Sequence, residues 1–477
     1  MKPFLRFTSL ALFIFTFAAF SFGQVQGPDA DGAAATVKGS AAGYVRALPV
    51  SMDHSQATQT AIPTLDFPNV PNADSSRVIF SAGSGAVRDT SNHAGTGSGT
   101  GASPSGRSDS EWDRDDRRPN RPSIDGLDSV ATFSGAFINQ AGPSLGSLFP
   151  FIMMGNHPLA GGTTVIPAQI TTVNLRLLNA DGTLNVNVPF SFKDLLEDSP
   201  NFEEANYRSG RHIQYGDAIH RAQFFHTMGP EWHTVLRPRF VNDVTFTIPR
   251  FVNVRFADGS VKPVQAYRLG TAADGNHFVL MLDLLFNFLF SNQVVNDINA
   301  GNFTTNALST TMLPNTFLFS INNQGQLAGC CVLGFHTFFF IPDATPQPRW
   351  VTQFASWISP GIFGGGFEDV TAFSHETAEA IADPFVNNAT ASWQFPGVPA
   401  NAKICQNNLE EGDPIEVLSN ATVPITLRER HEVFTYHPQN IPLLQWFEMG
   451  AKSNAIDGAF SFPDETALPH SALPCPM

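Results

Sequence analysis

The composition of the first quarter of the chain confines folding to the residues that follow it. Residues 81–106 are mostly Gly, Ser, Ala and Thr, and residues 107–121 mix both charge signs before two prolines. Such a stretch buries too little apolar surface to offset the entropy lost on ordering. We therefore predict a disordered, solvated tether over residues 24–123, in which the more apolar segment 47–80 forms at most a short ordered or pro-peptide-like piece.

The N-terminus has the order of a secretory signal peptide. Basic Lys2 and Arg6 precede an apolar run over residues 9–20, and small residues follow up to Gly23. This order predicts cleavage after residue 23 and a secreted or cell-surface protein, periplasmic or extracellular. An uncleaved anchor is the alternative, but the run is short for a membrane span, and no later segment has the length and hydropathy of one.

Charge and cysteine content narrow the class further. The net charge of −15 argues against a nucleic-acid partner, because binding a phosphate backbone needs concentrated Lys and Arg. The four cysteines permit one or two disulfides in an exported chain. Adjacent Cys330 and Cys331 rarely bridge each other, so we expect Cys405 to pair with Cys475, or each of these to take one of the adjacent pair.

Residues 124–270 are predicted to form a β-rich domain with a helix or two. β-branched residues and a turn with the sequence Asn-Ala-Asp-Gly indicate a hairpin. The predicted elements are strands at 163–175, 184–188 and 244–254, a turn at 179–183 and a helix at 216–228.

Residues 271–477 are predicted to form a second domain, in which a sheet carries one helix of chemical interest. That helix begins at Val370 with Asp369 as its N-cap and ends at Asp383, because a residue before Pro is pushed out of the α region. The other predicted elements are a helix at 278–298, strands at 316–321, 331–341 and 350–358, and a Gly-rich loop at 361–366.

The predicted helix carries the sequence His375-Glu376-Thr377-Ala378-Glu379. Residues four apart share one helix face, so an imidazole and a carboxylate there can bind one ion. The spacing matches the zinc-peptidase signature H-E-x-x-H, in which the intervening Glu is the general base. Glu379 replaces the second His, which should make a bound zinc a weaker Lewis acid and favour harder ions such as Mn²⁺ or Ca²⁺ somewhat more.

A third ligand has to come from downstream, because a catalytic zinc takes three protein ligands. Glu410 is the first choice and Asp413 the second, with His431 and His437 as further options. The alternative without a metal is that Glu376 and Glu379 are solvated surface acids and His375 makes an ordinary hydrogen bond.

Other histidines and nucleophiles have weaker patterns. The group His212, His220, His226 and His233 does not repeat on one helix face, so we do not expect a metal site there. His336 lies on a predicted strand and is expected to be packed or hydrogen-bonded rather than a ligand. No Gly-x-Ser-x-Gly elbow occurs, and no Lys-Ser or Lys-Thr follows the Gly-rich loop, which excludes a phosphate cradle of that kind.

Residues 373–384, with the sequence FSHETAEAIADP, together with Trp393 and the Glu-Glu-Gly-Asp run at 410–413, resemble the H-E-x-A-E-x-x-x-[DN]-P and E-x-[GA]-D pattern of exordium-like (phosphate-induced) proteins. The Gly-Phe-His segment at 334–336 is similar to a strand of the same group. The resemblance covers residues 315–415 and implies a zincin-like α+β domain, with a strand beside the motif helix that could pair with an extended peptide. Pro414 and Cys405 depart from the pattern.

These observations predict an exported zincin-like metalloprotein that hydrolyses peptide bonds. His375, Glu379 and a downstream acid, Glu410 or Asp413, would hold zinc or another divalent ion, and Glu376 would be the general base. Its partner would be a peptide or protein substrate. The alternative is a non-catalytic cell-surface or extracellular binding protein on a degenerate zincin frame, which the long tether would suit.

Overall fold

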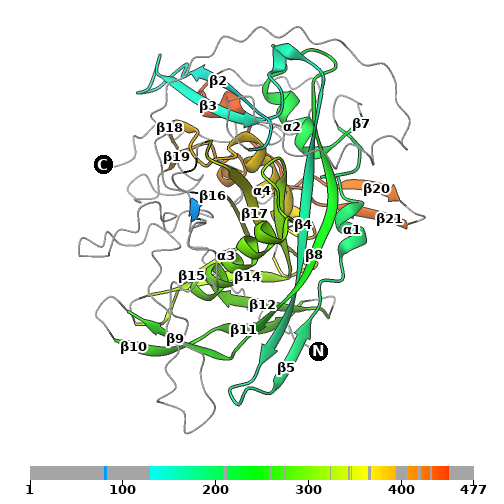
Figure 1. Cartoon of the computed structure of the whole chain (residues 1–477). Coiled ribbons are helices and arrows are strands. Elements are labelled where there is room, and N and C mark those ends of the chain that lie inside the picture. Colours follow the sequence, from blue (N-terminus) through cyan, green and yellow to red (C-terminus); the bar gives the residue numbers. More distant parts are fainter. Residues whose placement is uncertain are drawn as a thin grey trace, which may run out of the picture.

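The protein is rich in β-strands and has few helices (Figure 1). The computed structural model describes residues 80–82 and 129–450, apart from gaps at 208–211, 257–259, 273–274, 323, 342–343, 345, 364–366, 394–405, 416–420 and 430–431. The predicted signal peptide and nearly all of the predicted tether lie outside these residues. Among the helices described, none combines the length and hydropathy needed to cross a membrane.

A mixed seven-stranded sheet is the centre of the molecule. Its order is β1-β16-β17-β13-β4-β5, with β8 on the other edge of β4. The pairs β8–β4, β4–β13 and β13–β17 are parallel, whereas β17–β16, β16–β1 and β4–β5 are antiparallel. The strands are β1 (Phe80–Ala82), β4 (Thr163–Leu178), β5 (Leu184–Val188), β8 (His233–Ile248), β13 (Leu308–Pro314), β16 (Gly334–Phe340) and β17 (Arg349–Trp357).

A second sheet has the order β11-β12-β14-β15. The remaining strands form short antiparallel pairs, β2–β3, β6–β7, β9–β10, β18–β19 and β20–β21. Their bounds are β2 (Thr132–Ile138), β3 (Leu148–Met154), β6 (Ala205–Asn206), β7 (His212–Ile213), β9 (Phe251–Arg255), β10 (Val261–Gln265), β11 (Tyr267–Thr271), β12 (His277–Leu282), β14 (Thr316–Ile321), β15 (Leu327–Val332), β18 (Ala389–Trp393), β19 (Gln406–Asn408), β20 (Ile425–Glu429) and β21 (Glu432–Tyr436).

The α-helices described are α1 (Lys193–Glu197), α2 (Tyr215–Gln223), α3 (Asp283–Ala300), α4 (Thr371–Ala382) and α5 (Leu444–Phe447). Two 3₁₀ turns accompany them, η3 (Pro158–Ala160) and η4 (Asp413–Ile415). The predicted helix at 216–228 is confirmed as α2, although it ends earlier.

The predicted helix at 278–298 is wrong in its first residues, because 277–282 form strand β12 and the helix starts at Asp283. An apolar run with no polar interruption has no period that separates a buried strand from a buried helix, so the boundary was not visible.

The hairpin and the motif helix are confirmed. The turn predicted at 179–183 closes β4 onto β5, and Gly182 takes the positive φ of 80° that this turn needs. Helix α4 starts at Thr371 and is capped at Val370, one residue later than predicted. The Asp369 carboxylate accepts a hydrogen bond from the Val370 N–H and one from the His437 N–H, so it does not act as the N-cap.

Strand alternation places α3 and α4 on opposite faces of the large sheet. On β16 and β17 the side chains of Phe335, Phe339 and Phe354 pack in one apolar cluster with α3. The intervening Phe338, Val351 and Ala355 pack in another cluster with Phe373 and Ile381 of α4. Because successive side chains of a strand point to opposite faces, His336 lies on the α4 face together with Phe338.

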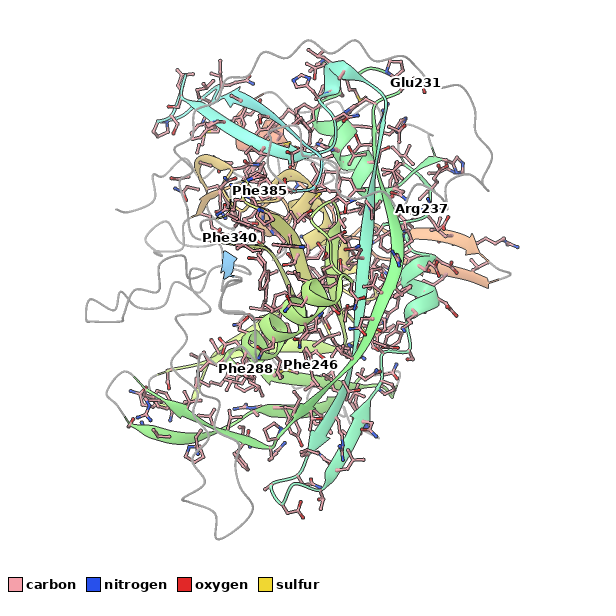
Figure 2. All side chains as sticks on the ribbon, viewed as in Figure 1. Glu231, Arg237, Phe246, Phe288, Phe340 and Phe385 are labelled. Atoms are coloured by element: carbon pink, nitrogen blue, oxygen red, sulfur yellow. A yellow bond between two sulfur atoms is a disulfide. The ribbon has the colours of Figure 1, made fainter. Side chains whose placement is uncertain are left out.

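Aromatic side chains fill the space around this sheet, as the sticks of Figure 2 show for Phe246 on β8, Phe288 on α3 and Phe340 on β16. Just beyond α4, Phe385 contacts the ring of Phe338 and lies under the guanidinium of Arg349. At Gly216 on α2, a Cβ would come within 2.7 Å of Ile381 on α4, so the two helices meet where α2 has no side chain.

The predicted domain boundary near residue 270 does not divide the large sheet. β4 and β8, from the first predicted domain, pair with each other, and β4 also pairs with β13, from the second. Two further strands of the second predicted domain, β17 and β16, complete the row. The described residues on either side of 270 therefore share one sheet.

The expectation for the cysteines is wrong at the adjacent pair. Cys330 and Cys331, on β15, form a disulfide with each other. The Cys330–Cys331 peptide bond is cis. Cys405 and Cys475 lie outside the described residues.

A buried carboxylate ties α3 to the two longest strands. Asp297, 1% exposed, accepts hydrogen bonds from Thr171 on β4 at 2.6 Å and from Asn242 on β8 at 2.6 Å. Asn302, after the helix, donates to it at 2.9 Å, and Gln293 also donates. One side chain thus satisfies donors from four places in the chain.

Replacing Asp297 by Ala should lower the free energy of unfolding by on the order of 3 kcal/mol, because it leaves these buried donors without an acceptor. Glu231→Ala is the control, since Glu231 is an exposed acid just before β8, and its loss should cost about 0.5 kcal/mol or less. Urea unfolding monitored by circular dichroism measures both. Equal losses for the two variants would contradict the role assigned to Asp297.

Candidate metal centre

Three segments far apart in the sequence bring their polar side chains to one place. They are β16 with His336, α4 with the predicted motif, and the turn after β19 with Glu410 and Asp413. The α4 helix packs on β16 and β17 through one side and on α2 through another. The polar cluster therefore lies inside the protein, between the sheet and the segment that follows β19.

The motif residues are buried rather than solvated. His375 is 5% exposed, and Glu376 and Glu379 are each 3% exposed. The alternative of solvated surface acids is therefore wrong. Carboxylates seldom lie this deep without a cation or a dense set of donors around them.

One half of the cluster is centred on His375. Its Nε2 lies 3.1 Å from Glu379 Oε1, 3.5 Å from Asp413 Oδ1 and 3.9 Å from Glu376 Oε1. Ligand atoms bonded to one tetrahedral zinc at 2.0–2.1 Å are separated by about 3.3 Å. The separations to Glu379 and Asp413 bracket that value, so each of these two oxygens lies at the distance from His375 Nε2 that two ligands of one ion would have.

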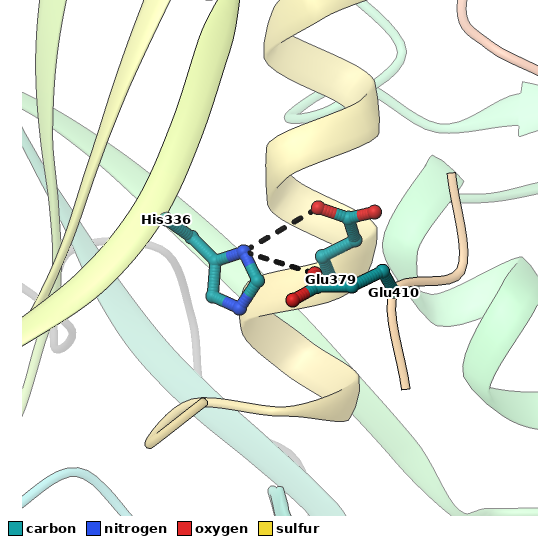
Figure 3. A group of neighbouring side chains, drawn as sticks. All are labelled: His336, Glu379 and Glu410. Carbon is teal, nitrogen blue, oxygen red and sulfur yellow. Dashed lines mark ion pairs between the residues drawn. The ribbon is translucent and has the colours of Figure 1, made fainter. Parts of the chain in front are cut away.

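The other half is centred on His336 (Figure 3). Its Nδ1 lies 3.4 Å from Glu379 Oε2, 3.7 Å from Glu376 Oε2 and 3.8 Å from Glu410 Oε2. His336 is 6% exposed. We expected this histidine to be packed or hydrogen-bonded rather than a ligand; it is buried, and its ring faces three carboxylates.

Gln439 fixes the orientation of the His375 ring. Its side-chain Nε2 donates to the Gly412 carbonyl at 2.6 Å, so its Oε1 is the atom that faces His375 Nδ1, at 2.9 Å. An amide oxygen can only accept, which makes Nδ1 the protonated nitrogen and directs Nε2 toward the carboxylates. Ligating histidines are held in this way in metal sites. The Gln439 backbone N–H is itself bound to Ser374 Oγ at 2.8 Å.

Glu410 and Asp413 are each held through one oxygen while the other faces a histidine, whereas Glu379 is held through Oε1, the same oxygen that lies 3.1 Å from His375 Nε2. The Gly412 N–H donates to Glu379 Oε1 at 3.0 Å, and Gln406 Nε2 donates to Asp413 Oδ2 at 2.8 Å. Asn408 Nδ2 donates to Glu410 Oε1. The Glu410 Oε2 and Asp413 Oδ1 atoms therefore point to the centre of the cluster. In metal sites, a hydrogen bond to the outer oxygen of a carboxylate likewise leaves its inner oxygen available to the ion.

Two glycines leave room for the cluster. A Cβ at Gly334, on β16, would lie 2.5 Å from Glu376 Oε1, and a Cβ at Gly412 would lie 2.3 Å from His375 Nδ1. Atoms do not approach that closely, so any side chain at either position would push Glu376 or His375 out of place. The main chain itself forms these two walls.

Most of the pKa values of the cluster are shifted in the direction that favours bound protons. Burial raises the pKa of Glu410 well above its usual value, and the neighbouring Glu379 raises it further. Burial also raises the pKa of Asp413, to about 7. Burial alone would lower the pKa of the two histidines, but the carboxylates, Glu410 for His336 and Glu379 for His375, raise it well above 6.5.

These directions show that protons would collect in the cluster if no other cation were present. The pKa of Glu379 moves the other way: burial would raise it, but His375 and then His336 lower it. Glu379 therefore keeps its negative charge between the two rings.

The other predicted candidates lie elsewhere. His437 Nδ1 is 2.8 Å from Asp369 Oδ2 and 3.2 Å from Glu368 Oε1, in a separate group before α4. His431 lies outside the described residues. Asp383, just after α4, accepts the N–H groups of Asn387 and Asn388 at 2.9 and 3.1 Å and so ends the helix.

The four histidines between 212 and 233 do not converge on a metal site. His220 is fully buried among aromatic rings, 4.8 Å from the Trp232 ring centre, and His233 pairs with Asp217 at 2.6 Å. His212 and His226 are exposed.

Sequence reasoning missed His336 and Gln439. Strand alternation offered a signal for His336, since Phe338 two residues later is apolar and its face had to be covered by the next helix. No sequence pattern pointed to Gln439, because a side chain that hydrogen-bonds the Nδ1 atom of a histidine can come from any distance along the chain.

Comparison with known proteins finds no match: no family model fits the sequence, and no curated protein or solved structure is similar to it. The resemblance to exordium-like proteins therefore stays a prediction.

Replacing Gln439 by Ala should weaken divalent-metal binding about 10–100-fold, the usual cost of losing such an outer hydrogen bond. Gln140→Ala is the control, because Gln140 bonds only the exposed Glu448 side chain at 3.1 Å among the described contacts. Competition with a zinc-sensitive dye measures both affinities. Unchanged affinity in Gln439→Ala would contradict the orienting role.

Proposed function

We propose that this protein is a divalent-metal protein, with zinc as the first choice, that hydrolyses peptide bonds. Its ion would be held by His375 Nε2, Glu379 and Asp413. Of the two downstream acids that the sequence suggested, Asp413 is the one that faces His375, whereas Glu410 faces His336.

One observation carries the proposal: hydrogen bonds from neighbouring residues orient the side chains of the cluster so that their potential metal-binding atoms face one another. His375 and Asp413 each give their second polar atom to a hydrogen bond with Gln439 or Gln406, and the Glu379 oxygen that faces His375 also accepts the Gly412 N–H. A nitrogen and two carboxylate oxygens form a donor set that zinc accepts, and three protein ligands leave a position for water. The residues present therefore fit the ion.

A bound zinc would acidify a water molecule and polarise a substrate carbonyl. The chain's own contribution is Glu376. Its Oε2 is buried and has no hydrogen-bond partner among the described residues, and it lies in the cluster 3.7 Å from His336 Nδ1. Glu376 would take a proton from the attacking water and pass it to the amine nitrogen that leaves as the peptide bond breaks.

The fold supports a peptide substrate and a zincin-like frame. The motif helix packs on one face of a mixed sheet whose antiparallel strand β16 runs beside it. The outer edge of β16 pairs with Phe80–Ala82 over three residues, so this edge accepts an extended segment. Pairing of an extended peptide with a strand edge is a common recognition mode.

The second candidate is a non-catalytic exported binding protein whose metal stabilises the fold. Its support is the depth of the cluster: His336, His375 and the surrounding acids are all 6% exposed or less. A polypeptide substrate needs access that such burial restricts. Export itself remains a prediction from the N-terminal sequence.

Purified protein should retain zinc, and removing it with a chelator should lower the melting temperature by several degrees, because a ligand that binds only the folded state stabilises it. Glu379→Ala should contain no bound zinc and should not respond to the chelator. Glu448→Gln, at a remote acid, is the control. Elemental analysis and thermal melts measure the effects, and a parent protein that takes up no divalent ion would overturn the proposal.

Glu376→Gln should reduce the turnover of a peptide library at least about 100-fold, the usual contribution of a general base. Its metal content should stay at the parent level. The control is Glu368→Gln, a change at an acid that pairs with His437 outside the cluster. If the parent and Glu376→Gln bind metal equally and neither cleaves any peptide, the hydrolase hypothesis is wrong and the non-catalytic binding protein is the better hypothesis.

A further inference from the structure

We propose that the cluster binds two divalent cations, the second between His336 Nδ1, Glu379 Oε2 and Glu410 Oε2, so that Glu379 bridges the pair. The inference rests on the proposed metal binding at His375. It gives functions to His336 and Glu410, which a single ion beside His375 leaves without one.

The position of the Glu379 carboxylate carries the argument first. Its Oε1 lies 3.1 Å from His375 Nε2, and its Oε2 lies 3.4 Å from His336 Nδ1. One carboxylate thus offers a different oxygen to each of two imidazoles from different elements, α4 and β16. A carboxylate that binds one ion through each oxygen has this arrangement.

The two halves have matching donor sets. Each has one imidazole nitrogen, one oxygen of Glu379 and one oxygen of an acid that the other half does not use, Asp413 beside His375 and Glu410 beside His336. The Glu410 carboxylate is held from behind by Asn408, as Asp413 is by Gln406. Carboxylate-rich sites with two histidines are known to hold pairs of iron or manganese ions in helix bundles.

The separations around His336 are those of long ion pairs and are also compatible with ligands of one ion. They are 3.4, 3.7 and 3.8 Å, longer than the roughly 2.7–3.2 Å of a hydrogen bond. They are near the roughly 3.3 Å that separates ligands of one tetrahedral ion, with the excess that a slightly larger ion would take up.

A second, independent observation points to a ligand. Glu376 Oε2, in a side chain that is 4% exposed, has no hydrogen-bond partner among the described residues and faces His336. His336 Nε2 is also buried without a partner there. Buried polar atoms are rarely left so, because each costs free energy unless a partner is present. Water on a second ion would supply a partner to Glu376.

Metal stoichiometry of the full chain tests the inference without any assay of activity. Protein stripped by a chelator is dialysed against Zn²⁺ or Mn²⁺ and analysed by elemental mass spectrometry. We expect about two ions per chain in the parent, as two three-ligand sites require. The metal content of Glu410→Gln and of Asp413→Asn should each fall to about one ion per chain, because each variant loses a ligand that belongs to only one of the two ions. Glu448→Gln should stay at the parent value.

Electron paramagnetic resonance of the Mn²⁺-loaded protein tests the bridge. Two manganese ions that share Glu379 should give an exchange-coupled spectrum in the parent. Glu410→Gln should give the six-line spectrum of an isolated ion instead.

The outcomes separate this inference from the function on which it rests. A parent that binds about one ion per chain, with Glu410→Gln unchanged, overturns the second site and leaves the first. A parent that binds none overturns both. Two uncoupled ions overturn the bridge. Circular dichroism checks that each variant is folded, and if Glu410→Gln is not, His336→Gln is the matching variant on the opposite side of the same site.

Discussion

The carboxylates of α4 are buried, and the rest of the site has to compensate their negative charge. The helix is covered by the sheet on one side and by α2 on another, so Glu376 and Glu379 have no water to solvate them. An uncompensated carboxylate in such a place costs several kcal/mol, roughly the whole margin by which a domain is stable. The two histidines, the donors behind each acid and the proposed cations all reduce that cost.

The same constraint explains the layout of the surrounding fold. A histidine at 336 reaches the acids only because β16 runs antiparallel to β17 and presents alternate residues to α4. The turn after β19 supplies the remaining acids, and Gln439 beyond the β20–β21 hairpin fixes a ring on α4. The cluster therefore exists only when segments more than a hundred residues apart in the chain are all in place. Metal affinity and folding must be coupled in such a site.

The parts of this structure that the sequence predicted are those with a local period or a local turn. The hairpin at 179–183 and the end of α4 at Asp383-Pro384 follow from residue chemistry within a few positions. The burial of His375 and Glu379 was not local information, because it depends on which elements cover the helix. The pairing of β4 with β13 joins residues that are far apart in the sequence, and no pattern within either strand predicts it.

The errors have the same origin. The start of α3 was placed too early because an apolar run alone does not distinguish β12 from a helix. The Cys330–Cys331 disulfide was not expected because adjacent cysteines rarely bridge each other, and a general frequency does not decide the outcome in one chain.

Gly334 and Gly412 give the site a further property. Where side chains line a metal site, a change of rotamer can enlarge or shrink it, and ions of different radius are accommodated. Here the surfaces behind Glu376 and His375 are main chain in a strand and in a hydrogen-bonded turn. Main chain has no rotamers, so neither residue can retreat to make room. If the proposed ions bind, the backbone would therefore limit the ionic radius that the site accepts, and discrimination between cations would depend on the fold as well as on the ligands.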